Sequence, residues 1–565
     1  MNDVLVRARA RAAEIRQRLG IKTEMERILE LPHQDFSTRT DLVNKWTGLL
    51  GRPNCTMPLR PVQAEILEEC SWASEQASPI GMIGNVGVGK GKTLAFFLVP
   101  EIFDAKSPVL IIPSSMRNQC DEDLWFWSRH YKFRKPLILT YSQLSQPAST
   151  GLLRQLSPDL IMADEAHCFR HASAARTKRF LRYMRDNPST RFVAMSGTLT
   201  GSTLSDYAHL CALSLREGSP VPRDDRDVAV WGSVLNSDGE PDEQAWATLA
   251  PLDLRAVGNV MLMRQAFNRR FRTTPGVVCT ETASCDAKLK LTALHPELAP
   301  EVTEALLTLE EEFALPNGLE IVDALHYHRA MRQLSVGFYY VWDWPEGEED
   351  LEWLDARREW WSACRRYLTQ NSREGCDSPF LVEEYVRERK PPGLYQALLR
   401  WDEQRHKPPP PTKPVWIDPG PVLAALHWLE GRDRALVWYG SKAVGDMLAA
   451  FGLPTFGAGD GTPRAESHPR AALAIEVHHK GRNYQAWNDQ LIMEPMPNAA
   501  TWEQLLGRTH RQGQTADVVQ ASVFQSAWPQ RLAFQRALVR SRYIAQMTGS
   551  SQKLLLADKK GFAGE

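Results

Sequence analysis

Two arginines near the C-terminal end of the chain are spaced to act together on a phosphate group. Arg508 and Arg511 lie three residues apart, with Gln504 one helical turn before the first of them. On a helix this spacing puts both guanidinium groups on one face. The guanidinium group is always charged and can bind phosphate oxygens in a bidentate manner. We therefore expect the pair to act on a nucleotide that is bound elsewhere on the chain.

A glycine-rich loop far upstream lies where a phosphate-binding loop is required. Residues 87–93 have the sequence GVGKGKT. The apolar run 79–83 before them is typical of a strand, and the apolar run 94–99 after them is typical of the start of a helix. A strand, a glycine loop and then a helix form the context of a P-loop.

Four residues of this loop have distinct expected roles. Gly89 and Gly91 let backbone N–H groups turn toward a phosphate, and the helix N-terminus adds the positive end of its dipole. Lys92 would reach the β- and γ-phosphates of ATP, and Thr93 would bind Mg²⁺. Val86 occupies the position of the first glycine in the strict P-loop pattern, so the loop fits only the shorter GxGKT form. A glycine-rich turn that binds nothing is the alternative.

Two acidic residues follow another strand-like run. Asp164 and Glu165 come directly after the apolar residues 160–163. Asp164 can hold Mg²⁺ through water, and Glu165 can orient or deprotonate an attacking water. Acidic loops after strands are common, but a position downstream of a GKT loop favours the nucleotide site.

The order of these segments resembles that of superfamily two nucleic-acid motors with Swi/Snf-like lobes. The GKT loop comes first, the DEAH sequence 164–167 second, the SGT sequence 196–198 third and the arginine segment last. Further segments that resemble the family are LRPVQ (59–63), IIPSS (111–115), TYSQL (140–144), MRQL (331–334), LVWYG (436–440) and GRNYQ (481–485). The resemblance runs from about residue 59 to about residue 523 and is nearest to compact members that bacteriophages encode.

The resemblance implies roles for residues beyond the loop and the acids. Arg508 and Arg511 would act as arginine fingers. The residues expected to bind the nucleotide are Arg60, Gln63 and Gln504. Gln63 would read adenine, and Gln504 would couple the nucleotide site to the nucleic-acid site. The residues expected to couple the ATP state to lobe movement are His167, Ser196 and Thr198. The residues expected to contact nucleic acid are Pro113, Ser114, Tyr141, Gly481 and Asn483.

The implied fold is α/β, with two RecA-like parallel-sheet lobes of the P-loop NTPase class and a mostly helical insertion between them. The implied activity is that of an ATP-dependent DNA helicase or translocase in replication, repair or recombination. ATP and Mg²⁺ are the implied cofactors, DNA is the implied partner, and a replication or recombination protein would supply a specific target. The alternatives are an RNA-directed motor, an ATP-binding nucleic-acid scaffold with little turnover, and a P-loop kinase, which leaves the second lobe unexplained.

Composition limits how such a protein can work. The chain of 565 residues is long enough for more than one domain. Its net charge is −1, so nucleic acid must be bound by a local basic groove rather than by a global field. The nine cysteines form no CxxC pair, which argues against a zinc module or a disulfide scaffold. No apolar run is long enough to span a bilayer, and the N-terminus lacks the apolar core of a signal peptide. We therefore expect a cytoplasmic protein of a bacterium or a phage-infected host, with no membrane partner.

The chain divides into five expected parts. These are an N-terminal helical segment (1–50), a first lobe (51–280), a helical insertion with a Pro-rich linker (281–414), a second lobe (415–525), and a C-terminal helix and tail (526–565). The arginine-rich residues 7–18 form either a solvated helix face or a contact to phosphates. Residues 262–272 are strongly basic. They form either the basic segment that the family has at this point or a helix that covers the edge of the first lobe.

Three expectations concern the later parts. The aromatic residues between 338 and 361 are flanked by acids, so we expect core packing rather than stacking on bases. His478 and His479 are adjacent and lack nearby ligand partners, so we assign them to the 481–485 loop rather than to a metal site. A strand at 415–417 should open the second lobe, and a helix over 530–553 should brace one lobe before a short tail.

Overall fold

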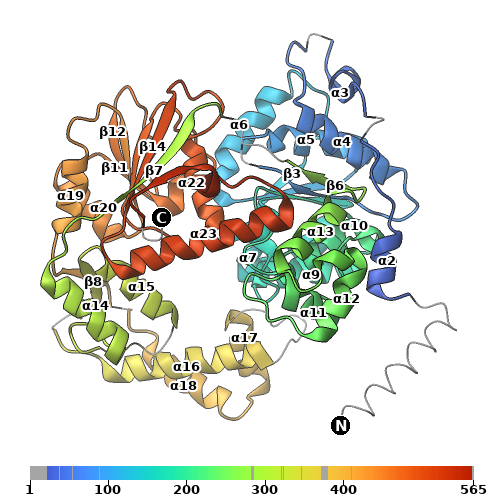
Figure 1. Cartoon of the computed structure of the whole chain (residues 1–565). Helices are drawn as coiled ribbons and strands as arrows, with labels where there is room; N and C mark the ends of the chain where they lie inside the picture. The colour runs from blue at the N-terminus through green and yellow to red at the C-terminus, as the bar shows by residue number, and fades with distance from the viewer. Residues whose placement is uncertain are drawn as a thin grey trace.

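The computed structural model describes residues 22–562, apart from residues 37–38, 54, 88, 281–284, 320, 322–323, 345–346, 371–378 and 409. Two α/β lobes, each built on one parallel sheet, are joined by a mostly helical region (Figure 1). This arrangement confirms the expected α/β class with two parallel sheets. The arginine-rich residues 7–18 lie outside the described residues.

Lobe one is built on a six-stranded sheet with the order β3-β2-β4-β5-β1-β6, in which every pairing is parallel. Parallel sheets are covered on both faces, so their strands need continuous apolar runs. The strands are β1 (Met82–Asn85), β2 (Pro108–Ile112), β3 (Leu137–Thr140), β4 (Leu160–Asp164), β5 (Arg191–Ser196) and β6 (Val277–Cys279).

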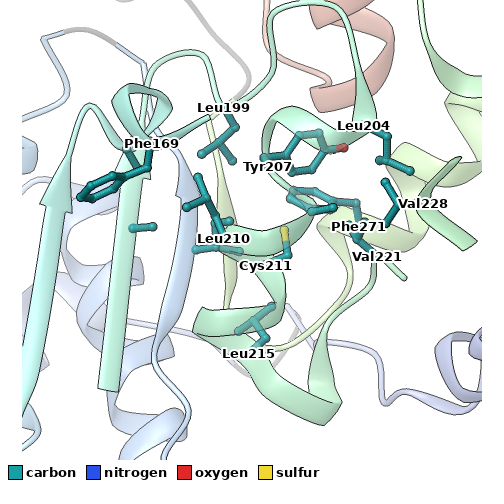
Figure 2. Packing of buried hydrophobic residues seen from close by; sticks show 14 of the residues in the cluster. Phe169, Leu199, Leu204, Tyr207, Leu210, Cys211, Leu215, Val221, Val228 and Phe271 are labelled. Carbon is teal, nitrogen blue, oxygen red and sulfur yellow. The ribbon is translucent and has the colours of Figure 1, made fainter. Parts of the chain in front are cut away.

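Helices cover both faces of this sheet. They are α2 (Glu24–Glu30), α3 (Leu42–Leu50), α4 (Pro61–Ser74), α5 (Lys92–Ile102), α6 (Arg117–Trp127), α7 (Tyr141–Ser145), α8 (Leu152–Leu156), α9 (Ala175–Asp186), α10 (Ala208–Leu215), α11 (Asp225–Leu235), α12 (Glu243–Leu249) and α13 (Val260–Arg272). Adjacent β1 residues belong to different cores, because Met82 packs with α4 and α5 while Ile83 packs with α10 and α13. Figure 2 shows part of the second core, where the Tyr207 and Phe271 rings meet edge to face at 5.9 Å.

Lobe two is built on a seven-stranded parallel sheet with the order β11-β12-β10-β13-β14-β7-β15. Its strands are β7 (Lys288–Leu294), β10 (Ala435–Tyr439), β11 (Thr455–Phe456), β12 (Arg470–Ala474), β13 (Asp489–Ile492), β14 (Val518–Phe524) and β15 (Asp558–Lys560). Its helices are α19 (Gly420–Trp428), α20 (Lys442–Ala450), α21 (Ile475–His478), α22 (Ala499–Thr509), α23 (Trp528–Thr548) and α24 (Lys553–Leu556).

The sheet of lobe two corrects the expected domain boundaries. Strand β7 lies in the range assigned to the insertion, and β15 lies in the range assigned to the tail, yet both belong to this sheet. Strand β7 pairs with β14 along its full length because its alternating sequence buries every second residue. The segment expected to open the lobe instead forms β9 (Thr412–Trp416), which pairs antiparallel with β8 (Phe338–Trp342) outside the sheet.

The region between the lobes is mostly helical, as expected. It contains α14 (Pro300–Glu312), α15 (Ala324–Leu334), α16 (Leu351–Gln370), α17 (Pro379–Arg389) and α18 (Leu394–Gln404). Trp353 contacts Trp342, Trp344 and Trp401, with ring centroids 5.8–6.1 Å apart. These contacts confirm core packing for the aromatic segment, although Trp361 stays exposed.

Helix α23 joins the two lobes rather than bracing one of them. Phe534 and Ala537 near its start pack in the core of lobe two, whereas Tyr543, Ile544 and Met547 near its end pack in the core of lobe one. Figure 1 shows this long helix running across the middle of the molecule toward α13. The expectation of a single braced lobe is therefore corrected.

Helix α13 accounts for the basic segment 262–272. Phe267 and Phe271 pack in the core of lobe one, and Arg270 donates hydrogen bonds to backbone carbonyls of the N-terminal segment, including that of Ile28 at 3.0 Å. Arg264 Nη1 donates to Gln546 Oε1 of α23 at 2.8 Å. These contacts favour the helix that covers the lobe edge. Among the described residues, no helix has both the length and the apolar character needed to cross a membrane.

Candidate functional site

The glycine loop connects β1 to α5, as the sequence predicted. Gly89 and Gly91 have positive φ angles of 80° and 81°, a conformation that favours glycine. A Cβ on Gly91 would lie 2.4 Å from Gln63 Nε2, so this position has no room for a side chain. Lys92 is 9% exposed, and its Nζ donates to the carbonyls of Val86 at 3.0 Å and Gly87 at 3.3 Å. The Lys92 ammonium group therefore lies against the backbone of the glycine loop.

Arg60 and Gln63 hold the loop from the start of α4. Arg60 Nη1 donates to Gly89 O at 2.6 Å, and Gln63 Nε2 donates to Gly91 O at 2.8 Å. Gln63 Oε1 also accepts from the Arg60 backbone N–H at 2.8 Å. Both residues therefore lie at the predicted site, where they support the loop. The reading of adenine by Gln63 stays a prediction, because both ends of its amide bind backbone here.

The acidic residues lie at the carboxyl end of β4, two strands from β1 in the same sheet. The backbone N–H of Glu165 donates to Asp164 Oδ1 at 2.9 Å. Burial raises the pKa of Asp164 even though Lys92 is near. Burial also opposes ionisation of Glu165, but Lys92 and His167 hold its pKa below the usual value. The charge of Lys480, which comes from lobe two, acts on Glu165 in the same direction.

The three predicted coupling residues form one hydrogen-bonded group with Glu165. His167 Nδ1 lies 2.9 Å from Ser196 Oγ, and Ser196 Oγ donates to Glu165 Oε2 at 3.2 Å. The backbone N–H of Thr198 donates to Ser196 Oγ at 3.1 Å. Although burial disfavours a charged imidazole, Cys168 and Glu165 raise the pKa of His167 to about 9. A protonated His167 can donate to Ser196, which passes a hydrogen bond on to Glu165.

Two residues offer oxygen ligands of the kind that Mg²⁺ prefers. Asp164 is a buried carboxylate, and Thr93 lies at the first turn of α5 beside the glycine loop. The described residues contain no cluster of three or more His, Cys, Asp or Glu side chains that could enclose a metal ion. This donor set fits Mg²⁺, which proteins usually hold with one or two carboxylates together with substrate phosphates and water.

Arg508 lies in the last turn of α22 on lobe two, whereas Arg511 comes two residues after the end of that helix and faces the glycine loop. The two arginines therefore do not share one helix face, contrary to the prediction from their spacing. Arg511 Nη2 lies 3.6 Å from the position that a Cβ on Gly89 would occupy. Its Nη1 donates to Asn483 Oδ1. Burial lowers the pKa of Arg511, and the charge of Arg60 lowers it further. Arg511 therefore meets the loop of lobe one, as the sequence predicted.

Arg508 is held more deeply in lobe two. Its Nε donates to Gln504 O at 3.0 Å, and its Nη1 donates to Arg482 O at 2.8 Å. Burial lowers its pKa to about 10, with the charge of Arg511 adding to the shift. The nearby Glu165 carboxylate favours its charged form. Gln504 is buried on the same helix, and its contact with a nucleotide stays a prediction.

The residues predicted to contact nucleic acid have different surroundings. Ser114 is exposed at the carboxyl edge of β2, next to the buried Pro113. Gly481 of lobe two approaches lobe one, because a Cβ on it would lie 3.0 Å from Met116 Cγ. Asn483 accepts a hydrogen bond from Arg511 and so lies beside the arginine that faces the glycine loop.

Tyr141 corrects one of these predictions. It is only 5% exposed, and its hydroxyl donates to Asp164 O at 2.7 Å. A side chain that is buried and hydrogen-bonded in this way supports the acidic loop and is not available to nucleic acid. Tyr141 is the first residue of α7, directly after β3, and the sequence gave no sign of the direction of its side chain.

Two further features of the site were not predicted. Lys553 of α24 places its Nζ 3.2 Å from His510 Nδ1, and His510 Nε2 lies 2.7 Å from Ala287 O. These contacts fix the chain between the two arginines and use residues from three distant segments. Lys90 of the glycine loop lies near enough that the charge of Lys553, after burial, lowers its pKa. No local pattern in the C-terminal segment indicates such a contact.

A cavity of about 1030 Å³ adjoins the glycine loop. It is lined by Arg60 and Lys90 of lobe one, by Gln512 of lobe two and by the N-terminal residues Phe36 and Arg39. Phe36 is 59% exposed, and the Arg39 guanidinium lies 5.3 Å from the centre of its ring. The cavity therefore offers an aromatic face and several cations next to the loop.

Comparison with known proteins gives no match to a protein-family model and no significant similarity to a curated protein.

Packing accounts for the two adjacent histidines, His478 and His479. His478 is buried with its Nδ1 2.6 Å from the Tyr484 hydroxyl, and burial lowers the pKa values of both His478 and His479 to about 4.

Proposed function

We propose that this protein is a nucleic-acid-stimulated ATPase that couples ATP hydrolysis to movement along DNA. One observation carries the proposal: Arg511 of lobe two lies against the glycine loop of lobe one, 3.6 Å from the Cβ position of Gly89. A single nucleotide bound at this loop would touch both lobes. In this proposal the two lobes are RecA-like lobes of a P-loop NTPase, and the protein acts in the cytoplasm in DNA replication, repair or recombination.

The residues around the loop fit ATP with Mg²⁺. The N–H groups of the loop and Lys92 would bind the phosphates, and the cavity beside Phe36 has room for a nucleoside. Thr93 and Asp164 would hold Mg²⁺, whose charge would offset that of the phosphates. The bound triphosphate would thus be enclosed by cations from both lobes.

Glu165 is suited to orient the attacking water. Its pKa is held low by Lys92 and His167 against the effect of burial, so it is a carboxylate at neutral pH and a weak base. Arg511 would stabilise charge on the transferred phosphoryl group, as an arginine finger does. The group of His167, Ser196 and Thr198 links Glu165 to the segment after β5, so a change at the phosphate can reach the rest of lobe one.

Three variants test the site. Lys92→Ala and Glu165→Gln should abolish ATP hydrolysis, because they remove the phosphate cation and the water-orienting carboxylate. Arg511→Ala should lower kcat by about a thousandfold or more, as loss of an arginine finger does, while ATP affinity changes little. Arg464→Ala, which removes an exposed arginine elsewhere in lobe two, is the matched control.

The rates should be measured with duplex DNA, single-stranded DNA, RNA and no nucleic acid. We expect DNA to stimulate the wild type most. Persistent DNA-stimulated hydrolysis in both Lys92→Ala and Glu165→Gln would contradict the site, and equal wild-type rates with and without nucleic acid would contradict the function.

A further inference from the structure

A recess of about 650 Å³ lies between α15 of the interlobe region, α23 and the loop after β13 of lobe two, and it shares no lining residue with the cavity beside the glycine loop. Its lining includes four arginines that none of the motifs discussed above explains as a group. Arg329 and Arg332 are three residues apart on α15, and Arg536 and Arg540 are four residues apart on α23. Each pair therefore lies on one face of its helix. We call this site the basic recess.

The positive charge of the basic recess is only partly balanced. Arg332 Nε lies 3.8 Å from Glu494 Oε1, and Arg540 Nη1 donates to Pro497 O at 2.9 Å. Arg329 and Arg536 are exposed, and no ion pair joins either of them to another described residue. Two cations in the recess are thus available to an anionic ligand.

Two acids line the recess: Glu476, which is exposed, and Glu494, which is already engaged by backbone. Glu494 accepts hydrogen bonds from the backbone N–H groups of Gly440 and Ser441, and from Ser441 Oγ at 2.6 Å. Gly440 directly follows β10, and Glu494 follows β13. The recess therefore adjoins the carboxyl ends of two central strands of lobe two.

The positive surface continues toward lobe one. After the effect of burial, the charges of Arg536 and of Arg170, a residue of lobe one, lower the pKa of Arg540, whereas the charges of Asp206 and Asp238 of lobe one raise it. Arg170 comes directly after the short helix η3 (Ala166–Phe169), which begins within the DEAH sequence. The cations thus extend from the basic recess to the lobe that carries the acidic loop.

We propose that the basic recess binds the sugar–phosphate backbone of nucleic acid on its way across lobe two. The cations lie along two helices and continue to the other lobe. This elongated distribution of charge fits a polymer with evenly repeated charge better than a compact acidic peptide. Tyr327 and Trp528 also line the recess and offer aromatic surface to bases. This inference rests on the proposed function and assigns part of the path of the nucleic acid.

The test is the double variant Arg329→Gln/Arg536→Gln. It removes the two cations without ion pairs and leaves the contacts of Arg332 with Glu494 and of Arg540 with Pro497 O. The control is Arg358→Gln/Arg389→Gln, which removes two exposed arginines of the helical insertion. Affinity for a fluorescent single-stranded and a duplex oligonucleotide is measured at several salt concentrations, together with ATPase rates with and without DNA. Binding of labelled polyglutamate is measured in parallel.

The test variant should bind DNA about tenfold more weakly, and the salt dependence of log Kd should fall by about 0.7–0.9 for each lost phosphate contact. Its ATPase rate without DNA should equal that of the wild type. If the test variant and the control bind DNA equally, the recess is not on the path, although the proposed function stands. If the wild type binds no nucleic acid, both proposals fail. If only polyglutamate binding is lost in the test variant, the recess takes an acidic protein instead.

Discussion

At the scale of single residues, Tyr141 supports the acidic loop through one buried hydrogen bond to Asp164 O. Tyr141→Phe should leave that carbonyl without its partner and lower the free energy of unfolding by about 1–3 kcal/mol. It should also reduce kcat for ATP hydrolysis, because the Tyr141 hydroxyl no longer holds the backbone of Asp164 in place. DNA affinity should stay unchanged. Thermal unfolding, ATPase assays and DNA titrations measure these three effects.

Tyr183→Phe is the matched control for this variant. Its hydroxyl donates to Pro158 O at 2.9 Å, in the same lobe but before β4 rather than after it. Because Pro158 O also accepts from Thr190 Oγ1 at 3.0 Å, we expect a smaller loss of stability, with no change in kcat. A drop in DNA affinity for Tyr141→Phe alone would restore the original prediction that this residue contacts nucleic acid.

At the scale of elements, α24 acts on the site through Lys553. Burial and the charge of Lys553 both lower the pKa of His510, so its imidazole stays neutral and can accept from Lys553 Nζ. Lys553→Met should therefore raise the pKa of His510 and shift the acidic limb of the pH–rate profile to higher pH. The variant should lose more activity at pH 6 than at pH 8, because protonated His510 cannot keep the same contacts.

Two controls separate positioning from a general loss of stability. Lys553→Arg keeps the charge and should retain most of the activity and the wild-type profile. Lys559→Met removes a lysine of the same segment whose Nζ donates to the Ala557 carbonyl at 2.7 Å, and it should leave the pH profile unchanged. The same profile in Lys553→Met and the wild type would rule out the positioning role.

Elements with strong local signals could be predicted from sequence, and those fixed by distant partners could not. The strand-like runs at 79–83 and 160–163 are continuously apolar and the loop between 87 and 93 is rich in glycine, and the structure has β1, β4 and the glycine loop within a few residues of these positions. Strand β15 has the sequence DKK, and it exists only because β7 offers an edge to pair with. Lys553 and Tyr141 similarly depend on partners that are 43 and 23 residues away, so their directions could not be foreseen.

At the scale of the whole molecule, α23 belongs to the cores of both lobes and so limits how they move. Its end is anchored in lobe one by Met547, which is fully buried, and by hydrogen bonds to Gln546 from Arg264 at 2.8 Å and from Asn268 at 3.1 Å. A motor whose lobes separate must strain or release this helix. The position of Arg511 over the glycine loop therefore depends on packing far from that loop.

Met547→Ala tests this dependence. Loss of the buried side chain should destabilise lobe one by about 2–5 kcal/mol and loosen the end of α23. We expect a larger radius of gyration in small-angle X-ray scattering and a lower kcat for ATP hydrolysis, because Arg511 meets the loop less often. Leu210→Ala removes a side chain of α10 from the same core (Figure 2) and leaves the residues of α23 unchanged. It should cost similar stability while leaving the radius of gyration and kcat unchanged. Equal dimensions and equal kcat in the two variants would mean that α23 does not hold the lobes together.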